Sequence, residues 1–318
     1  AFTMDRANGL DIDPSKSCLK RGALGSHEKG SFVLDCLRDG SISDRSAFGN
    51  GSCRKKYRSP LLLLSIWMVL GTPSPALPFE VVDVFEGGTI RGTVRWTDET
   101  VPAAYLHKIE KNRDFCGKTT PDDALLINAE NRGMEHVLVY LVDIEKGKEA
   151  ENRYVNRIKG CRFIPRVMGA AAGSLLGFRH DDFITHNIHL FRLENNATIL
   201  NFGLPIHRWQ QTITRKNRHA GLLRMQCDIH VHMNGLIVSL EHGYFSTTDA
   251  DGTFEISDVP PGTYQIAALQ GGYQIQNIKE KGRKGFRPRY EKPHLIVKAV
   301  EVKTGETAAV TFEFDLNH

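Results

Sequence analysis

Runs of alternating polar and apolar residues follow one another from Phe79 onward, and they constrain the fold more than any other feature. Thr89–Trp96 alternates as a half-buried strand does, and His136–Val142 is a more continuous apolar run. Asp251-Gly252 and Pro260-Pro261-Gly262 are typical turn sequences between strands. No long amphipathic helical pattern interrupts the series. The sequence therefore predicts an all-β protein with two β-sandwich domains, over residues 77–240 and 241–318.

A basic flank, Lys55–Arg58, precedes the apolar run Pro60–Leu70, and the small-residue segment Gly71–Ala76 follows it. This order is typical of a secretory signal peptide, which we expect over residues 56–76, and the apolar run is too short to span a bilayer comfortably. A buried helix or strand is the alternative. Residues 1–55 have no sustained apolar period and are expected to be a mis-assigned or disordered extension. The sequence thus predicts export to the periplasm or the cell exterior, with no membrane span in the mature form.

The excess positive charge lies at the N-terminal end of the sequence. Residues 1–58 hold 11 Lys/Arg and 7 Asp/Glu, whereas residues 79–318 hold 30 basic and 30 acidic residues. The expected mature part is therefore neutral overall, and nucleic acid is not an expected partner.

Two short segments, His186–His189 and Cys227–Met233, carry residues with metal-ligand chemistry. The second segment reads C-x2-H-x2-M. A type 1 (blue) copper site needs a thiolate and two imidazoles in a near-trigonal plane, with a weak axial thioether. Cys227–Met233 can supply the thiolate, one imidazole and the thioether from a single tight loop, and His186 fits as the second imidazole. Zinc is the nearest rival metal, but it has little use for Met. Taken singly, a Cys is usually a small buried hydrophobe and a Met is usually core packing.

The cysteine count fits this assignment. Six cysteines are present, and three of them lie in the N-terminal extension. The remaining three are an odd number, so in an oxidising compartment one of them is expected to be unpaired. With Cys227 assigned to a metal, Cys116 and Cys161 remain as a candidate disulfide. No second Cys is present in the ligand loop, as a binuclear copper site would require.

Both ligand segments resemble the cupredoxin fold, with the His-Asn pair similar to plastocyanin and the short loop similar to amicyanin. More closely, residues 87–270 resemble bacterial plastocyanin-like proteins labelled methylamine utilization proteins. The shared motifs are found at Cys116-Gly117, Gly160–Pro165, His186–His189 and Cys227–Met233. The resemblance implies one type 1 copper ion and electron transfer with a redox partner protein, a cytochrome or a copper enzyme.

The resemblance also implies roles for individual residues. Asn187 would tie the two ligand loops together by hydrogen bonds, although a plain polar turn residue is an equal alternative. His230 is expected to present the solvent-facing edge through which electrons leave. Relatives commonly have an aromatic residue just before the loop Met; here it is His232. On a strand-like stretch His230 and His232 point to opposite sides, so we expect His232 to face away from the metal, toward solvent or the outer side of the loop. The expected copper ligands are His186, Cys227, His230 and Met233.

Residues 241–318 resemble the carboxypeptidase regulatory-like, prealbumin-like β-sandwich through Thr248–Ile266, and such modules rarely carry chemistry. Within it, Lys279–Lys292 holds seven Lys/Arg and two Glu, a local charge of 7 − 2 = +5. This favours either a solvated loop or a docking site for an acidic partner. The complete expectation is a cupredoxin-like β-sandwich followed by a smaller prealbumin-like one.

The sequence does not favour an enzyme, because it has neither a nucleophile elbow nor a zinc-protease helix. Two non-enzymatic functions stand beside electron transfer. One is a copper-binding module for storage or delivery, and the other is a metal-free β-sandwich for adhesion or carbohydrate binding.

Overall fold

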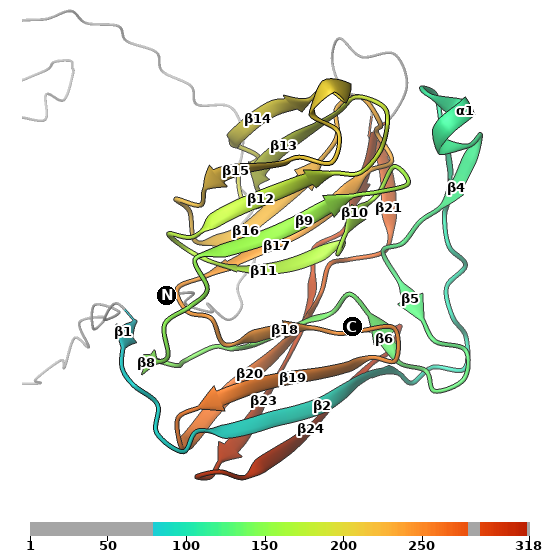
Figure 1. Cartoon of the computed structure of the whole chain (residues 1–318). Helices are drawn as coiled ribbons and strands as arrows, with labels where there is room; N and C mark the ends of the chain where they lie inside the picture. Colours follow the sequence, from blue (N-terminus) through green and yellow to red (C-terminus); the bar gives the residue numbers. More distant parts are fainter. Residues whose placement is uncertain (1–78, 279–286, 317–318) are drawn as a thin grey trace, which may run out of the picture. The chain divides into compact units, whose positions relative to one another are not determined.

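The structure is a computed structural model that describes residues 79–278 and 287–316. All of these residues lie in one compact unit, which extends from Leu77 to His318. The expected N-terminal extension and signal peptide lie outside the described residues. Within the described ranges the helices are short, namely α1 (Arg113–Cys116) and the 3-10 helix η1 (Ile206–Arg208), and the remaining regular structure is strand (Figure 1). The predicted all-β class is confirmed.

Two sheets enclose the core that carries the ligand segments. The four-stranded sheet has the order β10-β9-β12-β15 and consists of β9 (Arg153–Ile158), β10 (Phe163–Ile164), β12 (Leu175–His180) and β15 (Thr212–Lys216). The five-stranded sheet has the order β11-β17-β16-β13-β14 and consists of β11 (Val167–Ala171), β13 (His186–Arg192), β14 (Thr198–Leu204), β16 (Gly221–Gln226) and β17 (Asn234–Leu240). Phe178 of one sheet packs with Ile188 and Met225 of the other in one buried cluster. The two sheets are therefore the layers of a β-sandwich.

Strand patterns in this first sandwich follow from burial. β17 is buried along almost its whole length and has neighbours on both sides, which explains why its sequence reads as a continuous apolar run. Pro165 cannot donate to a strand ladder, and it separates β10 from β11. β10 accordingly lies at the edge of its sheet.

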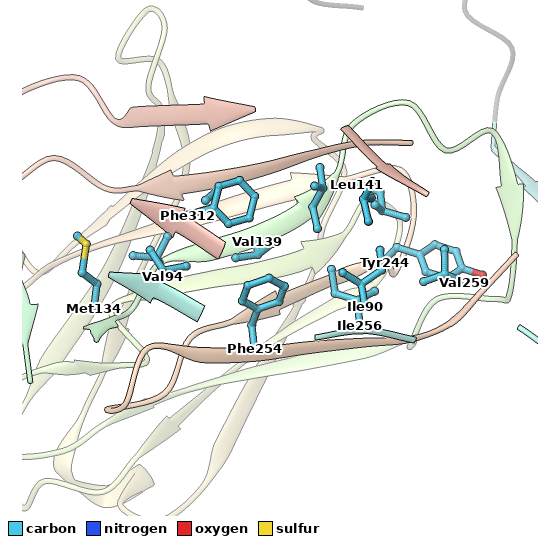
Figure 2. Close-up of a cluster of buried hydrophobic side chains, with 14 of the residues drawn as sticks. Ile90, Val94, Met134, Val139, Leu141, Tyr244, Phe254, Ile256, Val259 and Phe312 are labelled. Atoms are coloured by element: carbon cyan, nitrogen blue, oxygen red, sulfur yellow. The ribbon is translucent and has the colours of Figure 1, made fainter. Parts of the chain in front are cut away.

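A second pair of sheets encloses another core. The four-stranded sheet has the order β18-β7-β20-β23 and consists of β7 (Leu138–Leu141), β18 (Phe245–Thr247), β20 (Gly262–Gln270) and β23 (His294–Val302). The three-stranded sheet has the order β19-β2-β24 and consists of β2 (Gly88–Trp96), β19 (Thr253–Val259) and β24 (Thr307–Phe314). Figure 2 shows the core that they share, where Ile90, Phe254 and Phe312 face Val139 and Leu141.

The strand pairing differs from the sequential division at position 240. β2 and β7 precede the first sandwich in the chain, yet they pair with strands that follow it: β2 lies between β19 and β24 (Figure 1), and β7 pairs with β20. The first sandwich is thus an insertion between two parts of the second. The alternation of polar and apolar residues indicates which face of a strand is buried but not which strand pairs with it. The sequence alone therefore grouped β2 and β7 with the strands that follow them directly, in one domain over residues 77–240.

The remaining strands form two-stranded sheets in the connections. They are β1 (Glu80–Val81) with β8 (Lys146–Gly147), β3 (Leu106–Lys108) with β4 (Thr119–Pro121), β5 (Leu126–Ile127) with β6 (Met134–Glu135), and β21 (Ile275–Ile278) with β22 (Arg287–Tyr290). The hairpin of β3 and β4 carries α1 between its strands, and this segment of residues 106–121, here called the cover segment, lies against the ligand loop.

Candidate metal centre

Three neighbouring strands bring the two ligand segments together. β13 begins at His186, and its partner β16 ends at Gln226, where the loop Cys227–Met233 leads into β17. His189 pairs with Gln226 across the ladder, so His186 and Cys227 lie at the same end of the sheet. The loop is a tight turn, because the N–H of Met233 donates to the carbonyl of His230 at 2.9 Å. Residues far apart in sequence thus meet at one sheet edge.

The donor atoms of His186, Cys227 and His230 all lie within 4.8 Å of one another, and all three residues are buried. The Cys227 Sγ is 3.8 Å from the Nδ1 of His230 and accepts the backbone N–H of His230 at 3.4 Å. The ring centroids of His186 and His230 are 4.7 Å apart. Met233 is buried in the same apolar cluster as Cys227. The structure therefore brings the three nitrogen and sulfur ligands together and places the predicted thioether residue in the adjoining core.

Both imidazoles are held so that Nδ1 is the nitrogen left for a metal. The Nε2–H of His186 donates to the Asp182 carboxylate at 3.0 Å, and the Nε2–H of His230 donates to the Asn112 Oδ1 at 2.9 Å. The Nδ1 of His186 is buried without a hydrogen-bond partner. Metal-binding histidines characteristically give their second N–H to a carboxylate or carbonyl, which fixes the tautomer. The orphaned nitrogen beside the sulfur fits a metal ion, because coordination would satisfy it.

The electrostatics favour a thiolate at this position. Burial raises the pKa of the Cys227 thiol, but the neighbouring imidazoles of His186 and His230 outweigh this effect. The backbone N–H groups of Asn187 and His230 act in the same direction, and the pKa falls to about 6. At neutral pH such a thiol is mostly ionised, and the thiolate is the form that binds metals.

A polar network fixes the two ligand loops to each other. The Asn187 Oδ1 accepts the backbone N–H of Asp228 at 2.5 Å, and its Nδ2 donates to the Asp228 carboxylate at 3.1 Å. Asn187 therefore bridges the segments of His186 and Cys227, as the resemblance implies. Asp228 also accepts from His189 at 2.8 Å, which ties the loop to β13.

Arg287 of β22, from the C-terminal part of the chain, also contacts the ligand loop. Its side chain is 1% exposed, and it donates to the Cys227 carbonyl at 3.3 Å and to the Asp228 carboxylate at 3.1 Å. Arg287 belongs to the basic segment Lys279–Lys292, which was expected to be a solvated loop or a docking surface, and for Arg287 this expectation is wrong. Residues 279–286 of that segment lie outside the described residues. The Asp228 carboxylate compensates the charge of the guanidinium, which allows this arginine to be buried.

The expectation that His230 presents a solvent-facing edge is also wrong. His230 is 2% exposed, because the cover segment places Asn112 on its outer nitrogen. A disulfide joins Cys116, the last residue of α1, to Cys161, with 5.7 Å between the Cα atoms. Cys116 and Cys161 are the pair that the sequence left as a candidate disulfide. The cover segment is thereby fastened over the imidazole.

His232 is not directed to solvent either. It is 8% exposed, and its Nε2–H donates to the carbonyl of Cys161 at 3.2 Å. Burial and the neighbouring His230 and His107 lower the pKa of His232 to about 4. The expectation assumed a strand-like alternation between His230 and His232, whereas the turn at Met233 breaks that alternation.

Some site residues were not found from the sequence. Asp182 precedes His186 by one helical or loop turn, and an acidic residue near a ligand histidine is a usable, if weak, signal. Asn112 and Arg287 are distant in sequence from the ligands, and no local pattern marks them. A second group, Cys161, Asp182 and His186, also places donor atoms within 4.8 Å of one another, but its sulfur belongs to the disulfide.

No protein-family model matches the chain, and no curated protein matches it. Parts of the chain are similar to solved copper proteins. A proline-to-glycine mutant of amicyanin in its reduced Cu(I) form matches at 17% identity and a TM-score of 0.25, over 29% of this chain and 85% of that one. A purple cupredoxin from Nitrosopumilus maritimus matches at 16% identity and a TM-score of 0.24, over 27% and 98%.

A copper-containing nitrite reductase from Thermus scotoductus SA-01 matches at 16% identity and a TM-score of 0.26. Here the match covers 32% of this chain and 25% of the other. At these identities and TM-scores we base no argument on the likeness, and the site is interpreted from its own geometry.

Proposed function

We propose that this chain binds one copper ion in a type 1 site and acts in electron transfer. The expected ligands are a near-trigonal set of two imidazoles and one thiolate, with a thioether on a long axial bond: His186, His230, Cys227 and Met233. The observation that carries the proposal is the convergence of three buried donor atoms within 4.8 Å, one of them a thiol with a pKa near 6. This donor set is the one that type 1 copper uses.

The residues themselves supply what a one-electron site needs. Copper in such a site cycles between Cu(I) and Cu(II). Asp182 orients His186, Asn187 holds the two loops at a fixed separation, and burial excludes water from the ligands. Ligands that cannot move or hydrate keep similar positions in both oxidation states. The β-sandwich is therefore suited to electron transfer rather than to substrate chemistry, which would need an open coordination position.

Because the cover segment lies over His230, a redox partner would not contact this imidazole directly. Its outer nitrogen contacts Asn112, so an electron leaving through this imidazole would pass through the cover segment. Phe115 of α1 is exposed on that segment. We propose that the redox partner, a cytochrome or a copper enzyme, docks on the cover segment.

Export to the periplasm or cell exterior is part of the proposal. It rests on the signal-peptide pattern of residues 56–76 and on the Cys116–Cys161 disulfide, which suits an oxidising compartment. None of the helices in the described ranges has the length and apolar character needed to traverse a bilayer.

A visible spectrum tests the copper proposal. Full-length protein loaded with Cu(II) should show an intense thiolate-to-copper band and a narrow copper hyperfine splitting, and Cys227→Ser should abolish both. His207→Gln, at an exposed histidine outside the site, should leave them intact. A colourless Cu(II) adduct in the wild type would contradict the proposal. Rapid loss of copper to a mild chelator would instead favour storage or delivery, and no copper binding would favour a metal-free adhesive or carbohydrate-binding protein.

A further inference from the structure

A small, partly open cleft lies beside the proposed copper centre, on the other side of Met233. Its wall includes two histidines from distant parts of the chain, His107 of β3 and His232 of the ligand loop. Its empty volume, open mouth included, is about 250 Å³. Much of this volume is open to solvent, and the enclosed part has room for about one water molecule, so the cleft suits an ion better than a substrate molecule.

Both cleft histidines are oriented by one nitrogen and leave the other without a partner. The Nε2–H of His107 donates to the Asp122 carboxylate at 2.5 Å, and the Nε2–H of His232 donates to the Cys161 carbonyl at 3.2 Å. Among the described residues, no hydrogen bond engages the Nδ1 of either ring. The carboxylate–histidine and carbonyl–histidine pairs are the arrangement that prepares an imidazole lone pair for a metal.

The spacing of the two rings matches a shared ion. Their centroids are 6.4 Å apart. Metal–nitrogen bonds are about 2.0 Å long, and a ring centre lies about 1.2 Å behind each nitrogen, so two imidazoles on one ion in a linear arrangement have centroids roughly 6.4 Å apart. His230 is at a similar distance from His232, but its Nε2–H donates to Asn112 and its Nδ1 lies beside Cys227 in the proposed type 1 site.

The rest of the wall selects the kind of ion. Asp122 and Asp123 contribute two carboxylates, which Arg162 and the buried Arg166 behind them balance, so the surroundings of the cleft are close to neutral and an ion would be held by its ligands rather than by net charge. Met233 also lines the cleft and offers a soft thioether. The potential ligands are thus two imidazoles and a nearby thioether. This set suits a soft monovalent ion.

We propose that His107 and His232 form a second metal site, which takes Cu(I), and that copper occupies it on its way to the proposed type 1 centre. The binding site stands on its own geometry, whereas the loading role rests on the proposed function. Copper held there would lie near the proposed centre, because Met233 both lines the cleft and belongs to the same buried cluster as Cys227. The cover segment closes the outer side of His230, so the cleft offers an approach from beside it.

Silver(I), a redox-inert substitute for Cu(I), tests the site in the metal-free full-length protein. Equilibrium dialysis should show one equivalent fewer in His107→Gln than in the wild type. Gln can still donate to Asp122, which keeps the fold. His207→Gln, at an exposed histidine, should match the wild type. Asp122→Asn should keep the site but weaken it by about 10- to 100-fold, as loss of an orienting partner does. Equal stoichiometry in His107→Gln and wild type would overturn the site.

Nitrogen-15 resonances of the imidazoles locate the bound ion. The Nδ1 signals of His107 and His232 should shift together on silver addition, and a shift of only one would overturn a shared site. The loading role has its own readout: with a limiting Cu(I) chelate, His107→Gln should reach the wild-type blue intensity more slowly. Equal rates would overturn that role. A wild type without a blue band would defeat the proposed function, and the silver difference between the variants would still be measurable.

Discussion

Replacing the disulfide by Cys116→Ala/Cys161→Ala should both destabilise the protein and uncover His230. The bond closes a loop across a sequence separation of 45 residues. The chain-entropy relation for a loop of that length gives about 4 kcal/mol at 25 °C. Asn112→Ala is the matched control, because it removes the hydrogen bond to His230 but keeps the disulfide, and should cost about 1 kcal/mol. Urea unfolding of the metal-free proteins measures both changes.

The same variants can be compared by histidine modification. Diethylpyrocarbonate labelling followed by mass spectrometry should find His230 protected in the wild type, since it is 2% exposed, while His207 reacts freely. In the disulfide-free variant the cover segment is no longer fastened, and His230 should react at a rate closer to that of His207. The reasoning would be refuted by an unfolding free energy within 1 kcal/mol of the wild type, or by His230 labelling that the disulfide does not affect.

Two further predictions concern buried charge. Arg287→Met should lower the reduction potential of the copper-loaded protein, because the buried cation beside the ligand loop disfavours the more positive Cu(II) site. Voltammetry measures the potential: Arg287→Lys should retain much of the wild-type value, and Arg289→Met is the control. An unchanged potential in Arg287→Met would contradict this reasoning. Burial lowers the pKa of His242 to about 4, so between pH 6.5 and pH 4 the unfolded chain binds a proton that the folded chain does not. The free energy of unfolding should therefore decline by up to roughly 3 kcal/mol as the pH falls through that window. Urea unfolding at pH 4.5 and 7.5 measures this decline, which should be smaller in His242→Gln. An equal decline in the wild type and in His242→Gln would contradict the role of His242.

The ligand segments could be predicted from the sequence because their chemistry is local. Cys227, His230 and Met233 occupy one loop, and the turn that joins them is specified by seven residues. Asn112 and Arg287 reach the same site from segments with no pattern that points to it. The orientation of His232 was missed for a related reason, since alternation holds in a strand but not in a turn.

The fold shows the same division between local and distant information. The alternation in β2 and β19 states correctly which side chains are buried, such as Ile90 and Phe254. It contains nothing about the parallel pairing of β2 with β24. Partner choice depends on which strands remain uncovered after the intervening sandwich has formed, and that is a property of the whole chain.

The insertion has a consequence for the order of folding. The Thr97 hydroxyl bonds the carbonyl of Phe314 across 217 residues, whereas Leu175 pairs with Arg153 within a short stretch of chain. Closing the longer loop costs more entropy and must wait until the intervening chain exists. The ligand-bearing sandwich should therefore assemble first and then hold β2 and β24 near each other. Until that happens, β2 presents an unpaired apolar edge, and this is the interval in which the newly made chain is most exposed to aggregation.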